Sequence, residues 1–141
     1  MDLTLPIGDV VLNIRVALIV KTKKGFIFER HKTGYYFLVG GRVKAGESSE
    51  QAVRREAMEE IGIPIKNLKM KAIIENFYIS HEKQVHELCF VYQTEEIVEK
   101  EFGKEFFIYN KAEIDKIDLQ PKIMGEVIVS ENKEILHLIS K

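Results

Sequence analysis

The sequence predicts an α+β fold in which a mixed β-sheet is sandwiched between α-helices. Six segments are rich in β-branched and aromatic residues, and one strongly helical stretch lies between the third and the fourth of them. Strands and helices do not alternate regularly, as they would in a doubly wound fold. The chain has 141 residues, 45% of them hydrophobic, and contains no repeat or linker-like segment. We therefore expect a single domain over residues 1–141.

The expected strands are short runs of alternating or continuous apolar character. They cover residues 14–20, 25–30, 35–39, 68–79, 86–92 and 105–109. Weaker patterns predict helices over 111–117 and 121–130, where Pro121 suits the first helical position. The tail at 134–140 reads as a last strand.

Charge and composition exclude several classes of protein. The 21 basic and 22 acidic residues give a net charge of −1, so there is no overall positive field of the kind that holds nucleic acid. The N-terminus has no basic segment before an apolar run, and the run Val16–Val20 is far too short to span a membrane. We expect a cytoplasmic protein without nucleic-acid or membrane partners.

The stretch 49–61 has both a start and a stop signal for a helix. Ser48 can act as N-cap, with Gln51 as its capping-box partner three residues later. Gly62, followed by Pro64, supplies the end.

Three carboxylates gather on one face of this helix. Glu56, Glu59 and Glu60 are related by i, i+3 and i+4 spacing, which makes them surface neighbours. A separate apolar stripe would dock the helix on the core and consists of Val53, Ala57 and Ile61. Like charges this close need water or cations, and hard oxygen ligands select Mg²⁺ or Mn²⁺. For the helix alone, the alternative is a solvated acidic face.

The residues around the helix decide against that alternative. The segment reads Gly41-Arg42-Val43-Lys44-Ala45-Gly46-Glu47 and, after seven residues, Arg55-Glu56-Ala57-Met58-Glu59-Glu60-Ile61-Gly62-Ile63. It resembles the Nudix box of the Nudix hydrolase superfamily (MutT-like) at every fixed position. Ala57 stands where larger aliphatic residues are usual. Upstream, the family often has Leu-Pro-Gly-Gly, whereas this chain has Leu38-Val39-Gly40-Gly41.

The resemblance implies a Nudix fold and a set of cation ligands. Glu56, Glu59 and Glu60 are expected to bind Mg²⁺, with Mn²⁺ as a substitute, and the carbonyl of Gly41 commonly joins them. Three residues are expected to take part in catalysis. Glu56 is the first candidate for the general base, Arg55 orients a glutamate, and Glu47 contacts a cation indirectly.

The position of the base stays open, because some family members use a glutamate from a later loop. The candidates of that kind in this chain are Glu82, Glu96, Glu99 and Glu101.

Candidate substrate contacts lie outside the box or in its loop. They are Arg30, His31, Arg42, Tyr78 and Glu87. Arg30 and His31 end the second expected strand, where a solvated turn is the alternative. Glu87 and its neighbour His86 lie on opposite faces of a strand, so only one of them can face a cleft. Aromatic rings such as Tyr78 can stack on a base but more often belong to the core.

The reaction implied is hydrolysis of a diphosphate bond in a nucleoside diphosphate linked to another moiety X. Nucleoside triphosphates, ADP-ribose or nucleotide sugars, and dinucleoside polyphosphates are candidate substrates. The competing hypothesis is a catalytically inactive Nudix-fold module that binds a nucleotide and regulates a partner. Homodimers are common in the family, so the resemblance also allows a homodimer.

Overall fold

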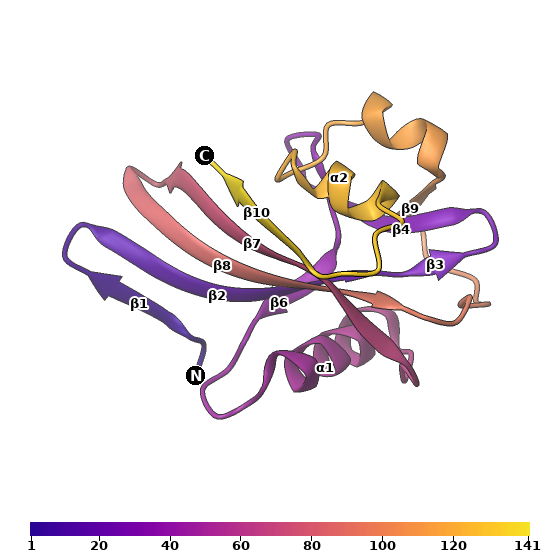
Figure 1. Ribbon diagram of the computed structural model, residues 1–141, viewed down its shortest axis with the longest axis horizontal. Helices are drawn as coiled ribbons and strands as arrows, with labels where there is room; N and C mark the ends of the chain where they lie inside the picture. The colour runs from indigo at the N-terminus through magenta and orange to yellow at the C-terminus, as the bar shows by residue number, and fades with distance from the viewer.

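Two β-sheets with helices outside them make up the chain, described over residues 1–141 by a computed structural model (Figure 1). The larger sheet follows the order β1 (Thr4–Ile7), β2 (Val10–Ile19), β8 (Lys83–Thr94), β7 (Leu68–Ser80) and β10 (Leu136–Ser140), and β6 (Val39–Arg42) also pairs with β2. The pairs β2–β8 and β7–β10 are parallel, whereas β1–β2, β2–β6 and β7–β8 are antiparallel. The predicted α+β fold with a mixed sheet between helices is confirmed.

The smaller sheet is centred on one strand. It contains β3 (Lys21–Thr22), β4 (Gly25–Arg30), β5 (Tyr36–Phe37) and β9 (Phe106–Tyr109), with β4 paired to the other three. The 3₁₀ helix η1 (Lys111–Lys116) and the short helix α2 (Met124–Val129) follow it in the chain. One core cluster joins α2 to β4 and to the facing side of the larger sheet through buried residues such as Phe28, Ile74 and Val127.

Helix α1 (Ser49–Ile61) covers the opposite face of the larger sheet (Figure 1). Its predicted capping box is present, with the Ser48 side chain accepting from the backbone of Gln51 and the Gln51 side chain accepting from the backbone of Ser48. Gly62 ends the helix in the left-handed region at φ 66°. The helix docks through four buried residues, Ala52, Val53, Ala57 and Ile61. The acidic face is therefore turned away from this core.

The N-terminal part of the larger sheet was not predicted from the sequence. β1 has only four residues and contains Pro6, which argues against a strand, although Leu5 and Ile7 lie on one face of it and are exposed to solvent. β2 and β8 start several residues earlier than expected because they pair with each other over ten residues, beginning with Val10 and Gln84. No helix of the chain has both the length and the apolar character needed to cross a membrane.

Three other elements also differ from prediction. The expected strand 35–39 is split, because Tyr36 and Phe37 pair with β4 whereas Val39 onwards pairs with β2. The helix expected at 111–117 is a 3₁₀ helix. The helix expected at 121–130 begins at Met124, so the prediction of Pro121 at its first position is wrong.

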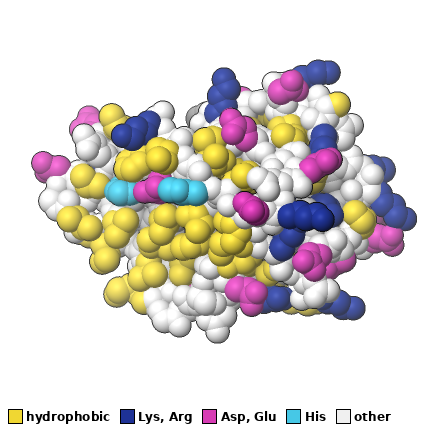
Figure 2. All heavy atoms as spheres, in the orientation of Figure 1, with side chains coloured by type: hydrophobic (Ala, Val, Ile, Leu, Met, Phe, Trp, Pro, Cys, Tyr) yellow, Lys and Arg dark blue, Asp and Glu magenta, His cyan; other side chains and the backbone are white.

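Part of the larger sheet is left uncovered on the side of α1. Figure 2 shows hydrophobic side chains gathered at the left of the molecule, over the ends of β1, β2, β7 and β8. Leu5, Ile7 and Ile79 are exposed there by 52%, 59% and 75%. Apolar patches on soluble proteins commonly mark contact surfaces.

Candidate functional site

The acidic face of α1 lies against the backbone of β6. The Gly40 amide donates a hydrogen bond to Oε2 of Glu60 at 3.1 Å. A Cβ atom built at Gly41 would overlap the carboxylate of Glu56, so only glycine lets the strand and this carboxylate approach so closely. The backbone of Gly40 and Gly41 therefore lies directly against the carboxylates of Glu60 and Glu56.

Arg55 holds the surrounding carboxylates in place. It donates to both oxygens of Glu47, at 3.1 Å from Nε and 2.6 Å from Nη2. Its Nη1 donates to Glu56 at 2.8 Å and to Glu59 at 3.4 Å, and Nη2 also reaches the carbonyl of Arg42 at 3.0 Å. One guanidinium thus connects three acidic side chains and the loop before the helix.

Glu29 on β4 joins the acidic group from another direction. Burial raises its pKa, and so do the nearby carboxylates of Glu105 and Glu56. Its Oε2 is buried and has no hydrogen-bond partner. Sequence reasoning missed Glu29, although a charged residue near the end of the apolar run Phe26-Ile27-Phe28 was a usable signal.

Glu60 is the most perturbed of the box glutamates. Burial raises its pKa to about 7, with further contributions from the charges of Glu29 and Glu56. The Gly40 hydrogen bond and the positive charge of Arg15 act in the opposite direction. Several carboxylates therefore crowd a partly desolvated place with too little positive charge to balance them.

This donor set fits a hard divalent cation. In the chain alone, no three acidic, histidine or cysteine side chains are already arranged around a common point as metal ligands. However, carboxylate and backbone carbonyl oxygens are the donors that Mg²⁺ and Mn²⁺ take, and a cation would offset both the burial and the repulsion that raise the pKa of Glu60. The glycine contact at Gly41 and the buried, unpartnered oxygen of Glu29 agree with this.

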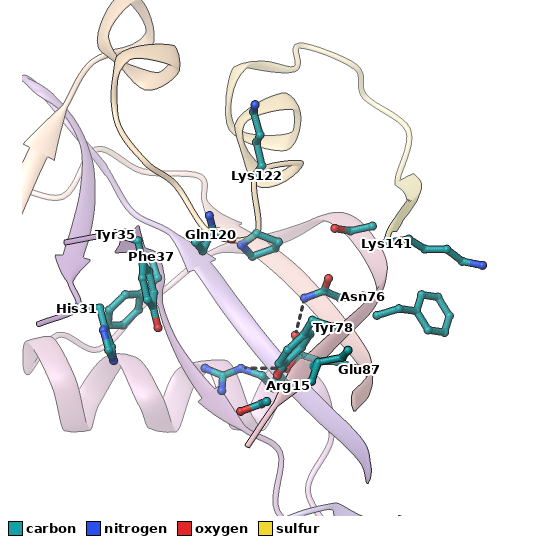
Figure 3. Close-up of a pocket in the computed structure, with 15 residues that line it drawn as sticks. Arg15, His31, Tyr35, Phe37, Asn76, Tyr78, Glu87, Gln120, Lys122 and Lys141 are labelled. Atoms are coloured by element: carbon teal, nitrogen blue, oxygen red, sulfur yellow. Dashed lines mark hydrogen bonds and ion pairs between the residues drawn. The ribbon is translucent and has the colours of Figure 1, made fainter. Parts of the chain in front are cut away.

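A cavity of about 830 Å³ opens on the face of the larger sheet opposite α1 (Figure 3). Figure 3 shows Tyr35, Phe37 and His31 on one side and Tyr78, Glu87 and Arg15 along its floor. Rings of His31 and Tyr35 stack in parallel with centroids 4.5 Å apart. The volume is sufficient for a nucleotide-sized ligand.

The floor of the cavity is a polar network built around Glu87, which is only 6% exposed. Glu87 accepts hydrogen bonds from Nδ2 of Asn13 at 2.9 Å, Nδ2 of Asn76 at 3.3 Å and the hydroxyl of Tyr78 at 3.2 Å. Nε of Arg15 lies 3.8 Å from Glu87 Oε1. Burial and Glu87 together raise the pKa of Tyr78 to about 12, so its hydroxyl stays a donor.

The candidate substrate contacts separate into two groups. His31, Tyr78 and Glu87 line the cavity, and His86 lies on the opposite face of β8 from Glu87. Arg30 and Arg42 do not line it. Arg30 is exposed with its guanidinium 5.9 Å from the ring centroid of Tyr36, and Arg42 lies 4.0 Å from Asp2.

Sequence reasoning missed the polar residues beneath the cavity. Asn13 and Arg15 interrupt the start of an apolar strand at alternate positions, and Asn76 does the same before Tyr78. Polar residues two apart on a strand share one face, and this was the available signal.

The later-loop glutamates lie in other settings. Glu96 accepts from the backbone amides of Lys66 and Asn67, and Glu99 pairs with Lys23 at 3.0 Å. Glu82 lies in the turn between β7 and β8 with a positive φ of 66°. Glu29 is the acidic residue outside the box whose charge acts on Glu60.

Sequence comparison finds relatives with high identity over a short segment of about 40 residues. The chain is 55% identical over 40 residues to an NAD-capped RNA hydrolase NudC from Photobacterium profundum, and 54% identical over 41 residues to one from Pasteurella multocida. These matches cover 28% and 29% of this chain but only 15% and 16% of the relatives. The chain therefore aligns with a small part of these longer proteins.

Structure comparison finds the same fold in several solved proteins. A MutT protein from Methanosarcina mazei Go1 matches with a TM-score of 0.69 and 23% identity over 87% of this chain and 96% of that chain. A MutT protein from Bacillus halodurans matches with a TM-score of 0.68 and 21% identity over 89% of both chains. An Ap4A hydrolase from C. elegans has a TM-score of 0.62 and 19% identity over 82% of this chain and 92% of that chain.

The sequence model of the NUDIX domain matches residues 9–123, which is most of the chain and contains both the acidic face of α1 and most of the cavity floor. The resemblance of the box is thereby confirmed, and the chain belongs to the NUDIX domain family of hydrolases.

Proposed function

We propose that the chain is a Mg²⁺- or Mn²⁺-dependent hydrolase that cleaves the diphosphate bond of a nucleoside diphosphate linked to a second moiety. The observation that carries the proposal is the crowded carboxylate group of α1 and β4, where the pKa of Glu60 is raised to about 7. A cavity of about 830 Å³ opens on the other face of the larger sheet and is lined by Arg15, whose charge acts on Glu60. Such a group favours divalent cations, and such a cavity accommodates a nucleotide.

In this proposal, Glu56, Glu59, Glu60 and the carbonyl of Gly41 hold the cations. When bound, the cations neutralise the diphosphate and lower the pKa of a coordinated water. Glu59 is the most accessible of the three carboxylates, with 55% of its side chain exposed. Only 13% of the Glu56 side chain is exposed. Arg55 keeps Glu56 turned towards β6, because it donates to Oε1 of that carboxylate at 2.8 Å.

The proposed chemistry is an in-line displacement at phosphorus. An oxygen–phosphorus bond forms to water, the bridging phosphorus–oxygen bond breaks, and the second phosphate leaves with the bonding electron pair. Glu56 accepts the proton that the water loses. Glu47 acts indirectly, because it fixes Arg55 through two hydrogen bonds.

The nucleoside of the substrate is proposed to occupy the cavity. The stacked pair of His31 and Tyr35 offers an aromatic surface to a base, and Tyr78 presents a second ring. Glu87 is 94% buried and bonded to protein groups, so we assign it a supporting role beneath the ligand. Arg42 and Arg30 lie outside the cavity and remain proposed contacts for the solvent-facing part of the substrate.

A catalytically inactive nucleotide-binding module is the alternative. All four box glutamates are present, at positions 47, 56, 59 and 60, which favours an active enzyme. The names of the relatives widen the choice of substrate, since NudC is named for NAD-capped RNA and the C. elegans protein for Ap4A.

The decisive experiment is a substrate panel read by mass spectrometry. It contains nucleoside triphosphates, ADP-ribose, nucleotide sugars, Ap4A, NAD and an NAD-capped RNA, each with Mg²⁺ or Mn²⁺. We expect release of phosphate or of a nucleoside monophosphate from a small nucleotide, and the masses identify the phosphorus attacked. Turnover of the capped RNA alone would contradict the expectation of a small-molecule substrate. No turnover at all would favour the inactive module.

Glu56→Gln tests the assignment of the base. We expect loss of at least about 1000-fold in kcat with an unchanged circular dichroism spectrum. Glu50→Gln is the matched control, because Glu50 lies in the first turn of α1 and pairs with Arg54 at 3.9 Å. Equal turnover in Glu56→Gln and Glu50→Gln would remove Glu56 from the mechanism.

We further propose a cytoplasmic homodimer that pairs through the uncovered apolar face described above (Figure 2). Support comes from the exposed side chains of Leu5, Ile7 and Ile79. Sedimentation velocity should give a dimer for the natural chain and a monomer for Ile79→Lys. Ile97→Lys, at a 47% exposed loop position, is the control and should leave the dimer intact. A monomeric natural chain would contradict this assembly.

A further inference from the structure

A row of polar side chains crosses all five strands of the main path of the larger sheet. Strand register aligns Thr4 with Asn13, Asn13 with Glu87, Glu87 with Asn76, and Asn76 with Ser140. Hydrogen bonds run along part of this row, from Thr4 to Asn13 at 2.8 Å and from both asparagines to Glu87. Asn13, Asn76 and Glu87 are each more than 90% buried.

Burying the Glu87 carboxylate destabilises the folded chain unless its charge is compensated. Taking a charge out of water is unfavourable unless hydrogen bonds and a counter-charge compensate. The two asparagines and Tyr78 supply the hydrogen bonds, and Arg15 supplies the counter-charge. The row therefore forms a fixed support for the partly exposed guanidinium of Arg15.

Glu87 positions Arg15 through an ion pair but does not occupy its hydrogen-bond donors. Its Nε lies 3.8 Å from Glu87, an ion pair that is longer than a hydrogen bond. Its side chain is 36% exposed and lines the cavity, with the guanidinium beside the Glu87 carboxylate in Figure 3. The N–H groups of Arg15 are thus available to an anion that enters the cavity.

Arg15 also lies at the junction between the cavity and the acidic face of α1. The next residue along β2, Val16, pairs with Gly41, whose carbonyl is a proposed cation ligand. Arg15 itself pairs with Arg42, whose carbonyl accepts a hydrogen bond from Arg55 at the acidic group. In the proposed function the diphosphate lies at the carboxylates and the nucleoside in the cavity, and Arg15 lines that cavity next to the residue that pairs with Gly41.

We infer that Arg15, positioned by Glu87 and the polar row beneath it, binds non-bridging oxygens of the substrate diphosphate where it enters the cavity. The inference rests on the proposed function, because it takes the diphosphate to be held at α1. A planar guanidinium with free N–H groups matches two phosphate oxygens at once. Glu87 is a positioning residue that acts through Arg15.

Steady-state kinetics with the most active substrate of the panel test the role of Arg15. Arg15→Gln should raise KM roughly tenfold or more and change kcat by less than about threefold, because an interaction with the intact diphosphate is uniform binding. Arg15→Lys should restore part of the affinity. Lys23→Gln removes the same charge outside the cavity and should leave KM unchanged. An unchanged KM in Arg15→Gln would overturn the inference.

Methylenediphosphonate with Mg²⁺ separates a phosphate contact from a base contact, because it carries two linked phosphorus groups and no nucleoside. It should compete with substrate in the natural chain, and Arg15→Gln should raise its Ki by the same factor as KM. No competition in the natural chain, or an unchanged Ki in the variant, would overturn the inference. Mn²⁺ binding to Arg15→Gln, measured by electron paramagnetic resonance without substrate, should match the natural chain.

A double-mutant cycle tests the positioning role of Glu87. Glu87→Gln should raise KM in the natural background but not in Arg15→Gln, whereas a general structural defect would add to both. Absence of turnover in the natural chain would overturn the proposed function itself. Turnover with KM unaffected by Arg15→Gln would overturn only the role of Arg15.

Discussion

Arg55 donates two hydrogen bonds to Glu47 at once, from Nε to Oε2 at 3.1 Å and from Nη2 to Oε1 at 2.6 Å. This two-point contact fixes the plane of the guanidinium and lowers the pKa of Glu47, chiefly through the hydrogen bond. Because the plane is fixed, Nη1 is directed at Glu56, 2.8 Å away. Glu47 and Glu56 are nine residues apart in sequence, and Arg55 connects them by donating hydrogen bonds to both.

Arg55→Lys should separate charge from geometry. Lysine keeps the positive charge but presents a single ammonium group, which cannot bond both oxygens of Glu47 in a fork and also reach Glu56. We expect kcat/KM on the panel's best substrate to fall by about 10- to 100-fold. Arg54→Lys is the matched control, since Arg54 contacts the carbonyls of Ile65 and Lys66. Equal activity in the two variants would contradict the positioning role.

Gly41→Ala should disturb the site by adding one methyl group. The new Cβ would overlap the Glu56 carboxylate, so either the side chain or strand β6 must shift. We expect Mn²⁺ affinity to drop at least about tenfold, because cation sites depend on ligand geometry. Gly125→Ala is the control, because its Cβ would meet only Ile114 at an ordinary 3.5 Å. Unchanged Mn²⁺ binding in Gly41→Ala would show that Gly41 and Glu56 do not bind the same cation.

The stability of the cation-free chain should fall as pH rises from 4.5 to about 7. Folded Glu60 has its pKa raised from 4.5 to about 7, so between these values the folded chain binds more protons than the unfolded chain. The free energy of unfolding therefore decreases with rising pH in this window. Glu29, whose pKa is also raised, adds to the effect. Thermal unfolding in EDTA from pH 4.5 to 8 measures it.

Mg²⁺ should reverse that trend, because it binds deprotonated carboxylates and stabilises only the folded chain. The increase in Tm on adding Mg²⁺ should be larger at pH 8 than at pH 5. Glu60→Gln removes the titrating group, so its Tm in EDTA should vary less with pH than that of the natural chain. An equal slope in the two proteins would assign the pH dependence to other groups.

Local signals in the sequence predicted the helix and its acidic face. The cap at Ser48, the stop at Gly62 and the spacing of Glu56, Glu59 and Glu60 all lie within 15 residues. Such signals depend only on helix periodicity and end geometry. The box resemblance then identified the family, which the NUDIX domain match confirms.

The cavity floor could not be predicted in the same way. Asn13 faces Glu87 only because β2 and β8 run parallel in one particular register, 74 residues apart in sequence. Glu29 comes close to α1 through β4, a strand of the other sheet. Both relationships depend on strand register and on the packing of two sheets, which a local pattern does not specify.

Glu29→Gln should have opposite effects on stability and on cation binding. The side chain is partly buried, its Oε2 has no hydrogen-bond partner, and its charge raises the pKa of Glu60. Replacing the carboxylate with a neutral amide removes this repulsion, so Tm in EDTA at pH 8 should rise. The same change removes a carboxylate from the crowded group, so Mn²⁺ affinity and kcat should fall, each by about tenfold. Glu105→Gln is the control, because Glu105 also repels Glu29 but is exposed and is not among the main causes of the raised pKa of Glu60. A Glu29→Gln variant with higher Tm and undiminished Mn²⁺ affinity would place Glu29 outside the cation site.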